Sequence, residues 1–195
     1  MCKLNRVPIR EAQGYATSRD FCALFTQEMS SLYLIAFLLT GDHAKAEQCF
    51  VGGLEASLDG NPVFKQWARS WARRMIVENA IRTIAPRPHN APVSTVAVDV
   101  EIPSEFDAMT DRDAAIANVL RFADFERFVF VMSVLEAYSD QDCSLLLSCS
   151  PLEIRDARTR AFQHIGQSYD RNVLAGSARG SRKDENLAEI ALKQI

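Results

Sequence analysis

The chain has 195 residues, 48% of them hydrophobic, and a formal net charge of −3. This composition allows one large or two small buried cores, and eight glycines and seven prolines are too few for a low-complexity protein. The longest apolar run, residues 32–39, is far too short to span a bilayer. Because residues 1–13 lack the apolar core of a signal peptide, we expect a cytoplasmic protein with no membrane partner.

The cysteines and histidines argue against a metal site and against catalysis. The five cysteines contain no CxxC pair and have no histidine at zinc spacing, so they are typical of small buried residues in a reducing compartment. The three histidines are scattered, and the chain has neither a glycine-rich phosphate loop nor a G-x-S-x-G turn. We therefore expect no metal, no cofactor and no enzymatic activity.

The first predicted elements are two helices. Apolar side chains at helical spacing predict one amphipathic helix over 18–40, ended by Gly41; they are Phe21, Leu24, Phe25, Met29, Leu32, Tyr33, Ala36 and Leu39. Asp42 is a predicted cap for a second helix, which runs to the turn signal at 59–62. The pair Gly52–Gly53 weakens that helix by about 1 kcal/mol per glycine relative to alanine, and it indicates close packing or a kink.

A basic third helix is predicted over 63–84, where Pro86 and Pro88 stop it. One side carries Phe64, Trp67, Trp71, Met75 and Ile76, and the charged residues of 64–87 are Lys65, Arg69, Arg73, Arg74, Arg82, Arg87 and Glu78, a net charge of +5. A local basic surface on an acidic protein indicates polyanion binding, and it is also typical of a solvated helix face. The two tryptophans fit either a core or a platform for nucleotide bases.

The chain then changes character. Residues 85–109 hold four of the seven prolines and a cluster of acids, which predicts an extended linker between two domains. A capping box at 110–113 opens the second domain. A helix over 123–138 is predicted to bury Phe125, Phe128, Val129, Met132 and Leu135. The expected fold is all-α, with helical domains at 18–84 and 110–165 and a C-terminal tail at 166–195.

Residues 138–165 predict a helix-turn-helix. Ser139 with Asp142, and Ser150 with Glu153, have the spacing of N-terminal caps, and Pro151 suits the first position of a helix. Only two residues separate the first of these helices from the second cap, so the helices must meet at a sharp angle.

The second helix of this pair sorts into two faces. Ile154, Ala157, Ala161, Phe162 and Ile165 form an apolar stripe, and the opposite face holds Glu153, Arg155, Asp156, Arg158, Thr159 and Gln163. Arginine and a small hydroxyl residue suit contacts with base edges and phosphates. The same pattern also describes an ordinary amphipathic helix with a charged, solvated face.

The order of these parts resembles the bacterial sigma factors of the extracytoplasmic-function group. In the first domain, Leu39-Thr40-Gly41-Asp42 and Ala46-Glu47 match the family pattern, and Trp71 with Asn79 matches it approximately. In the second domain the matching residues are Arg127-Phe128-Val129-Phe130, Tyr138-Ser139, Asp142-Cys143-Ser144, Ser150-Pro151, Ile154, Arg158 and Arg160-Ala161. The matches extend from Leu39 to Ala161 and so cover parts of both predicted domains.

The resemblance implies a transcription initiation protein that binds promoter DNA and core RNA polymerase, with an anti-sigma protein as a candidate partner. It implies DNA contacts from the recognition helix through Ser150, Arg155, Arg158, Thr159 and Arg160. It implies further DNA contacts from the basic helix through Arg69, Arg73, Arg74 and Arg82. Polymerase would dock at Glu47, Gln48 and Val51.

An alternative is a degenerate sigma-like interaction or regulatory protein without promoter recognition. Gln48 and Val51 stand where the family has an acid and a glutamine, and Thr83 stands where it has an aspartate. Ser148 replaces the glycine of the turn, and Leu152-Glu153 follows the proline at the start of the recognition helix. An acid near phosphates reduces affinity for DNA, because binding depends on neutralising phosphate charge.

Overall fold

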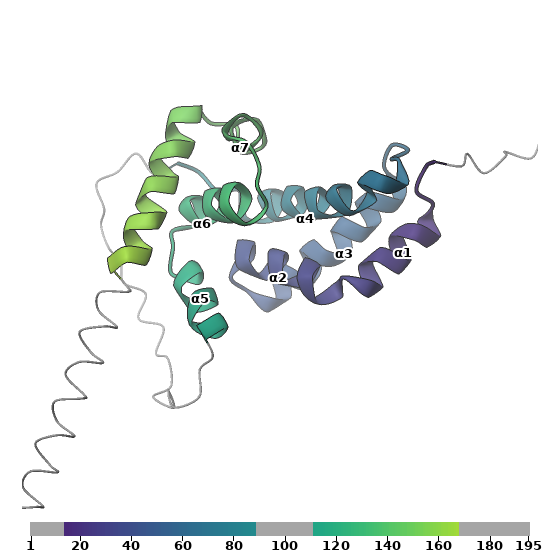
Figure 1. Cartoon of the computed structure of the whole chain (residues 1–195), viewed down its shortest axis with the longest axis horizontal. Helices are drawn as coiled ribbons and strands as arrows, with labels where there is room; N and C mark the ends of the chain where they lie inside the picture. Colours follow the sequence, from purple (N-terminus) through teal and green to yellow (C-terminus); the bar gives the residue numbers. More distant parts are fainter. Residues whose placement is uncertain (1–13, 89–110, 168–195) are drawn as a thin grey trace, which may run out of the picture. The chain divides into compact units, whose positions relative to one another are not determined.

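A computed structural model describes residues 14–88 and 111–167 of the chain. Over these two ranges the chain is helical apart from turns and one isolated bridge between Tyr15 and Phe64, so the predicted all-α class is confirmed for them (Figure 1). The chain divides into two compact units, Met1–Pro86 and Arg87–Ile195. Most of the predicted linker, Thr110 of the predicted capping box and nearly all of the tail lie outside the described residues.

The single helix predicted over 18–40 was wrong, because the structure has two helices there. Helix α1 (Ser18–Gln27) and helix α2 (Met29–Thr40) meet at Glu28 with a bend of 78°. Met29, expected in the buried stripe, is 54% exposed, whereas Glu28 forms an ion pair with Arg69. The bend lets both apolar faces pack on the same pair of later helices. No single helix in the described ranges is long and apolar enough to cross a membrane; α1 and α2 reach that length only together, across the bend.

The predicted junction between α2 and α3 (His43–Asp59) is confirmed. Gly41 ends α2 with φ of 67°, and its N–H donates to the Phe37 carbonyl. A positive φ of this size favours glycine because it has no Cβ. The Asp42 carboxylate then accepts from the Lys45 N–H at 2.8 Å and caps α3.

Close packing at the glycine pair of α3 is also confirmed. A Cβ on Gly53 would lie 2.7 Å from Cγ1 of Ile76, and a Cβ on Gly52 would lie 2.8 Å from Oδ1 of Asn79. Both neighbours belong to α4 (Ala68–Ile84), which runs beside α3 (Figure 1). The glycines therefore set the distance of closest approach between α3 and α4.

The basic helix begins later than predicted. Val63 and Phe64 are extended, a 3-10 turn η1 (Lys65–Trp67) follows, and only then does α4 start. Phe64 and Trp67 therefore leave the predicted apolar stripe, and Trp67 is 56% exposed. Burial along α4 involves Ala68, Ala72, Met75, Ile76, Val77 and Ala80.

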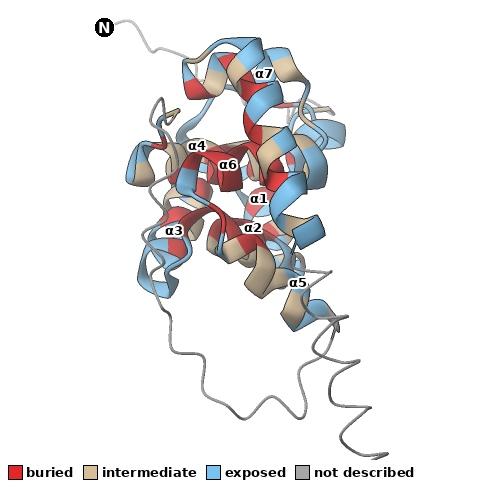
Figure 2. Cartoon of the chain, turned by 90° about the vertical axis from the view of Figure 1, so that its left-hand side faces the viewer, coloured by how far each residue is buried: buried red, intermediate tan, exposed pale blue. Residues whose placement is uncertain are grey.

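The second unit consists of α5 (Asp111–Leu120), α6 (Asp124–Phe130), a π-helical turn η2 (Val131–Leu135), α7 (Asp140–Leu147) and a helix over 151–167. Figure 2 shows α6 as an almost wholly buried helix. Of the residues predicted to be buried on 123–138, Phe125, Phe128, Val129 and Met132 are confirmed.

The uniform α-helix predicted over 123–138 was wrong at its C-terminal end. In η2 the Glu136 N–H donates to the Val131 carbonyl, five residues earlier, and the Tyr138 N–H donates to the Met132 carbonyl. A π turn holds about one residue more than an α turn, so later side chains are rotated by roughly 100°. Leu135 is consequently 48% exposed instead of buried.

Candidate nucleic-acid interface

Both helix caps predicted for 138–165 are present. Ser139 Oγ accepts from the Asp142 N–H at 3.1 Å. Ser150 and Glu153 form a reciprocal capping box: Ser150 Oγ accepts from the Glu153 N–H at 3.2 Å, and the Glu153 carboxylate accepts from the Ser150 N–H at 2.7 Å. The Ser150 hydroxyl also donates to this carboxylate, at 2.8 Å. The Ser150 backbone N–H first, and then this hydroxyl, lower the pKa of Glu153 below its usual value. Ser148 ends α7 with φ of 52°, so residues 148–150 form a compact turn before helix 151–167.

The apolar stripe of helix 151–167 is largely as predicted. Ile154, Ala157 and Ala161 are fully buried. Ile165 is half-buried, and Phe162 is exposed with one edge against Phe130 of α6, at a ring separation of 5.9 Å. The helix therefore packs through small residues and one isoleucine, which leaves Phe162 at the margin of the core.

Two of the predicted DNA-contacting arginines are engaged within the second unit. Arg158 forms a two-pronged ion pair with Asp140 of α7, with Nη1–Oδ1 at 2.6 Å and Nη2–Oδ2 at 3.4 Å. Arg160 Nε donates to Oε1 of Glu126 in α6 at 2.6 Å. His164 Nε2 lies 3.8 Å from the other oxygen of the same carboxylate. These two arginines therefore join helix 151–167 to its neighbours.

The other predicted recognition residues lie at the surface. Arg155 and Thr159 are exposed and bond within their own helix: Arg155 Nε donates to the Pro151 carbonyl at 3.3 Å, and Thr159 Oγ1 donates to the Arg155 carbonyl at 2.9 Å. Ser150 is exposed and acts as the cap described above. The surface they share also carries Leu152, which is 60% exposed, and Asp156.

On the basic helix, acids from an earlier part of the chain offset some of the charge. Three of the basic residues of 64–87 form ion pairs with acids: Lys65 with Asp20 at 3.3 Å, Arg74 with Glu78 at 2.9 Å, and Arg69 with Glu28. Asp20 and Glu28 lie outside 64–87, so the predicted net charge of +5 did not count them. The pKa of Asp20 is lowered, first by the backbone N–H of Thr17 and then by the Thr17 hydroxyl and Lys65.

The remaining two residues predicted on this helix behave differently from each other. Arg73 Nη2 donates to Ser31 Oγ of α2 at 2.8 Å, so this guanidinium joins α4 to α2. Arg82 is exposed near the C-terminal end of α4. The four predicted arginines thus lie on one helix and differ in their interactions: Arg69 and Arg74 form ion pairs with acids, Arg73 donates to a serine of α2, and Arg82 is exposed.

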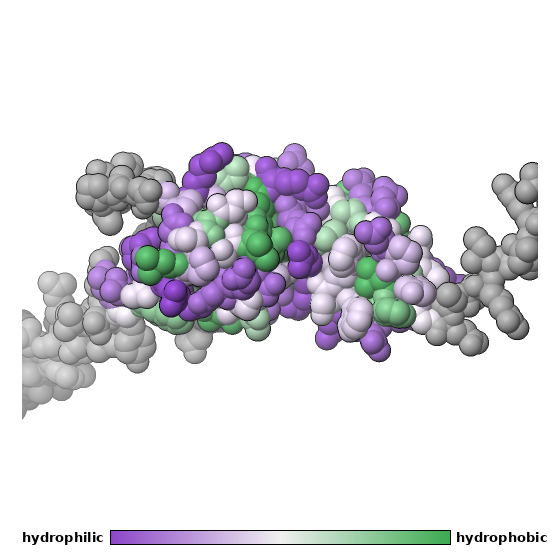
Figure 3. Space-filling view, turned by 90° about the horizontal axis from the view of Figure 1, so that it is seen from above, coloured by the Kyte–Doolittle hydropathy of each residue, from purple (hydrophilic) through white to green (hydrophobic). Residues whose placement is uncertain are grey.

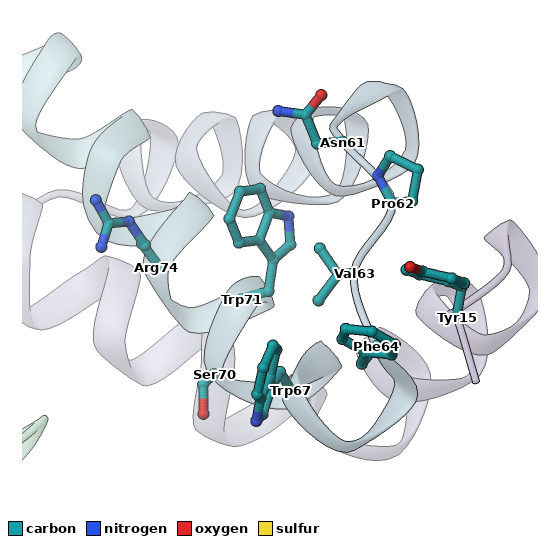
Figure 4. Close-up of a pocket in the computed structure, with 9 residues that line it drawn as sticks. All are labelled: Tyr15, Asn61, Pro62, Val63, Phe64, Trp67, Ser70, Trp71 and Arg74. Carbon is teal, nitrogen blue, oxygen red and sulfur yellow. The ribbon is translucent and has the colours of Figure 1, made fainter.

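A hollow lies beside the start of α4. It has a volume of about 480 Å³ and is lined by Tyr15, Asn61, Pro62, Val63, Phe64, Trp67, Ser70, Trp71 and Arg74. Figure 4 shows the aromatic rings around Val63, with Arg74 on one side and Tyr15 on the other. Tyr15 and Phe64 are stacked at 4.5 Å, and Phe64 meets Trp67 edge-on at 5.3 Å. Trp71 Nε1 is buried in the wall and has no hydrogen-bond partner among the described residues.

The hollow depends on residues that sequence reasoning missed. The Ala16 N–H donates to the Val63 carbonyl at 2.7 Å, and the Lys65 N–H donates to the Gly14 carbonyl at 2.8 Å. These two bonds hold Tyr15 against Phe64. Helical periodicity gives no signal for such a pairing, because both segments are extended and lie nearly 50 positions apart in the chain.

The residues predicted to dock polymerase share an exposed surface. Glu47, Gln48 and Val51 all lie on α3 and are exposed. Glu47 and Val51 are four residues apart and therefore neighbours on the helix surface. More widely, Figure 3 shows exposed hydrophobic residues in separate areas bordered by hydrophilic ones.

Comparison with models of known protein families found no match, and no curated protein sequence matches the chain.

Proposed function

We propose that this protein is a sigma-factor-like transcription initiation protein that binds promoter DNA and core RNA polymerase. The observation that carries the proposal is the group of exposed aromatic rings beside Arg74, at the hollow where α4 begins. The order of sequence motifs described above supports the same assignment.

The hollow has the chemistry of a site for single-stranded DNA. Aromatic rings accept unstacked bases, and each stacked base contributes about 1–3 kcal/mol with little dependence on sequence. Trp67 offers the most exposed ring, and Arg74 and Ser70 offer donors at the same wall. The volume of about 480 Å³ lies within the usual range for ligand pockets, roughly 300–1,000 Å³. We assign melted promoter DNA to this surface.

The ion pairs on α4 do not prevent phosphate binding. The side chains of Arg69 and Arg74 are 66% and 43% exposed. An exposed ion pair contributes only about 0–1 kcal/mol, so a phosphate can compete for either guanidinium. The pair between Arg160 and Glu126 differs, because Glu126 is almost fully buried and loss of its partner leaves an uncompensated charge. Arg160 is therefore assigned to the fold of the second unit.

In this proposal the exposed side of α3 binds polymerase. Glu47 and Gln48 supply polar groups and Val51 supplies apolar area, on a helix whose opposite side is fixed against α4 by the glycine pair. Since α3 packs closely against α4, we expect polymerase to bind this surface without a change in the position of α3.

A second candidate function is a degenerate sigma-like interaction or regulatory protein that does not recognise promoters. The specific observation in its favour is the engagement of Arg158 and Arg160, which leaves Arg155 as the exposed arginine of helix 151–167. One base-reading arginine supplies about 1–3 kcal/mol of discrimination, less than a specific DNA-binding protein normally needs.

Reconstitution with core RNA polymerase on a library of random promoter sequences separates the two candidates. The first predicts that the wild-type protein co-purifies with polymerase and enriches a promoter motif, and that Trp67→Ala weakens this enrichment. Met29→Ala is the matched control, because Met29 is similarly exposed and lies outside the hollow. Failure to bind polymerase, or enrichment of no motif, would count against the first candidate.

A further inference from the structure

The turn between α7 and helix 151–167 is bordered by two exposed leucines. Leu145 is 69% exposed and Leu152 is 60% exposed, and Leu145 has the highest exposure among the exposed large hydrophobic residues of the described ranges. Each lies within three residues of the 148–150 turn, so a rise of about 1.5 Å per helical residue keeps them close to it. We call this group of exposed residues on the two sides of the turn the leucine face and define it as Asp142, Leu145, Leu152, Arg155 and Asp156.

The charges on the leucine face are mainly negative. Asp142 precedes Leu145 by three residues on α7, and Asp156 follows Leu152 by four residues on the next helix, so each leucine has an exposed acid beside it. Glu153 adds a third, half-buried carboxylate, and Arg155 is the one cation of the face. Residues 139–165 as a whole hold four acids and three arginines, two of which are already paired with acids.

We infer that the leucine face is a docking surface for a basic segment of a partner protein, one that presents apolar side chains flanked by lysine or arginine. The leucines supply area whose burial is worth about 25 cal/mol per Å². The neighbouring acids select a cationic segment and repel an anionic one.

Other occupants fit less well. DNA carries phosphate charge, which the acids of this face repel. A second copy meeting the same face in a twofold dimer would bring four aspartates together with only two arginines, which leaves a net negative charge on both sides of the contact. An anionic membrane surface is disfavoured for the same reason.

This inference is independent of the DNA-binding role proposed for α4. The two surfaces belong to different units and use different residues. Each can therefore fail without the other.

The test is a selection from a library of random 16-residue peptides displayed on phage, with the full-length protein as bait. Counter-selection uses the double variant Leu145→Ser/Leu152→Ser, whose changes lie at exposed positions and whose fold is checked by circular dichroism. The expected result is enrichment of cationic peptides with apolar residues three or four positions apart. For the best synthetic peptide we expect the double variant to raise Kd about tenfold or more, and affinity to fall as salt increases.

Further variants test whether the selected peptide binds at the leucine face. Asp142→Asn/Asp156→Asn is expected to weaken the peptide several-fold, whereas Met29→Ser and Trp67→Ala leave its Kd unchanged. Enrichment of acidic or uncharged peptides, or no enrichment, would overturn the inference. So would duplex DNA that competes with the peptide and loses affinity in the leucine variants, because the face would then be a DNA reader. Loss of single-stranded DNA binding in Trp67→Ala alone concerns only the proposed function.

Discussion

Arg160 Nε donates to the carboxylate of Glu126 at 2.6 Å, across 34 positions of the chain. Glu126 lies on the almost wholly buried helix α6, and His164 approaches its second oxygen. The Glu126 carboxylate thus interacts with two side chains of helix 151–167, Arg160 and His164. The position of that helix therefore depends on this carboxylate.

Glu126→Gln is expected to destabilise the second unit by about 2–3 kcal/mol, because a partly buried charge pair loses one member. Both tryptophans belong to the first unit, so tryptophan fluorescence reports its unfolding and circular dichroism reports both units. The variant should lower the urea midpoint seen by circular dichroism and leave the fluorescence midpoint unchanged. Glu55→Gln, at an exposed position of α3, is the control. A variant as stable as the wild type would show that the pair contributes nothing.

Gly53→Ala should destabilise the first unit by roughly 1–3 kcal/mol, since its Cβ would meet Ile76 at 2.7 Å and force α3 and α4 apart. Gly166→Ala is the matched control, because that glycine is also helical and has nothing within 4 Å of the added Cβ. There the gain in helix propensity, about 1 kcal/mol at most, should dominate. The urea midpoint followed by circular dichroism, which reports both units, is expected to fall for the first variant only; a fall in both variants, or in neither, would contradict close packing at Gly53.

Ser148→Gly is expected to stabilise the second unit by roughly 0.5–1 kcal/mol. Ser148 has φ of 52°, a left-handed conformation that costs an L-residue about 1–2 kcal/mol, and the extra entropy of glycine in the unfolded chain offsets part of the gain. Urea unfolding followed by circular dichroism measures the change. Destabilisation would indicate that the serine side chain supports the turn.

Trp67→Ala should weaken binding of a single-stranded oligonucleotide by about 1–3 kcal/mol, the contribution of one stacked base. Fluorescence anisotropy of a labelled DNA measures the affinity, with Met29→Ala as the control. Since Trp67 is exposed, little change in the urea midpoint is expected. Unchanged affinity in Trp67→Ala would remove the hollow from the DNA-binding surface.

The stability of the second unit should fall with pH above about 9 because of Cys143. Burial, followed by the charges of Asp140 and Asp142, raises the pKa of this thiol from 9.0 to about 11. The folded state therefore holds the proton more tightly than the unfolded state. The resulting stability is fully present below pH 9 and is lost between pH 9 and 11, by about 1.4 kcal/mol per pH unit. The difference between wild type and Cys143→Ala in urea unfolding isolates this effect, and parallel pH profiles would contradict it.

Local signals predicted the helix ends well, and contacts distant in sequence explain the errors. The hydrogen bonds that end or cap these helices join residues no more than four positions apart, as at Gly41, Asp42 and Ser150. The local sequence is therefore enough to predict where such a helix begins or ends. The bend at Glu28 involves Arg69, 41 positions later, and no periodicity in 18–40 contains that information. The π turn at η2 likewise lies within a run whose spacing is that of an ordinary helix.

The sequence predicted which types of residue form the candidate site, but it predicted only part of their arrangement in space. The sequence places arginines and tryptophans on one basic segment, and the structure adds Tyr15 to the aromatic group. Pairing with Asp140 and Glu126 could not be foreseen for Arg158 and Arg160, because it requires the packed positions of α6 and α7.

The bridge between Tyr15 and Phe64 has a practical consequence for dissecting the protein. A fragment cut at residue 18, where helical periodicity begins, would keep every helix of the first unit yet lose Tyr15 and the two backbone hydrogen bonds that hold it. Such a fragment would fold around the same α3–α4 packing and present an altered wall beside Phe64. Fragments meant to retain ligand affinity should therefore start before Gly14.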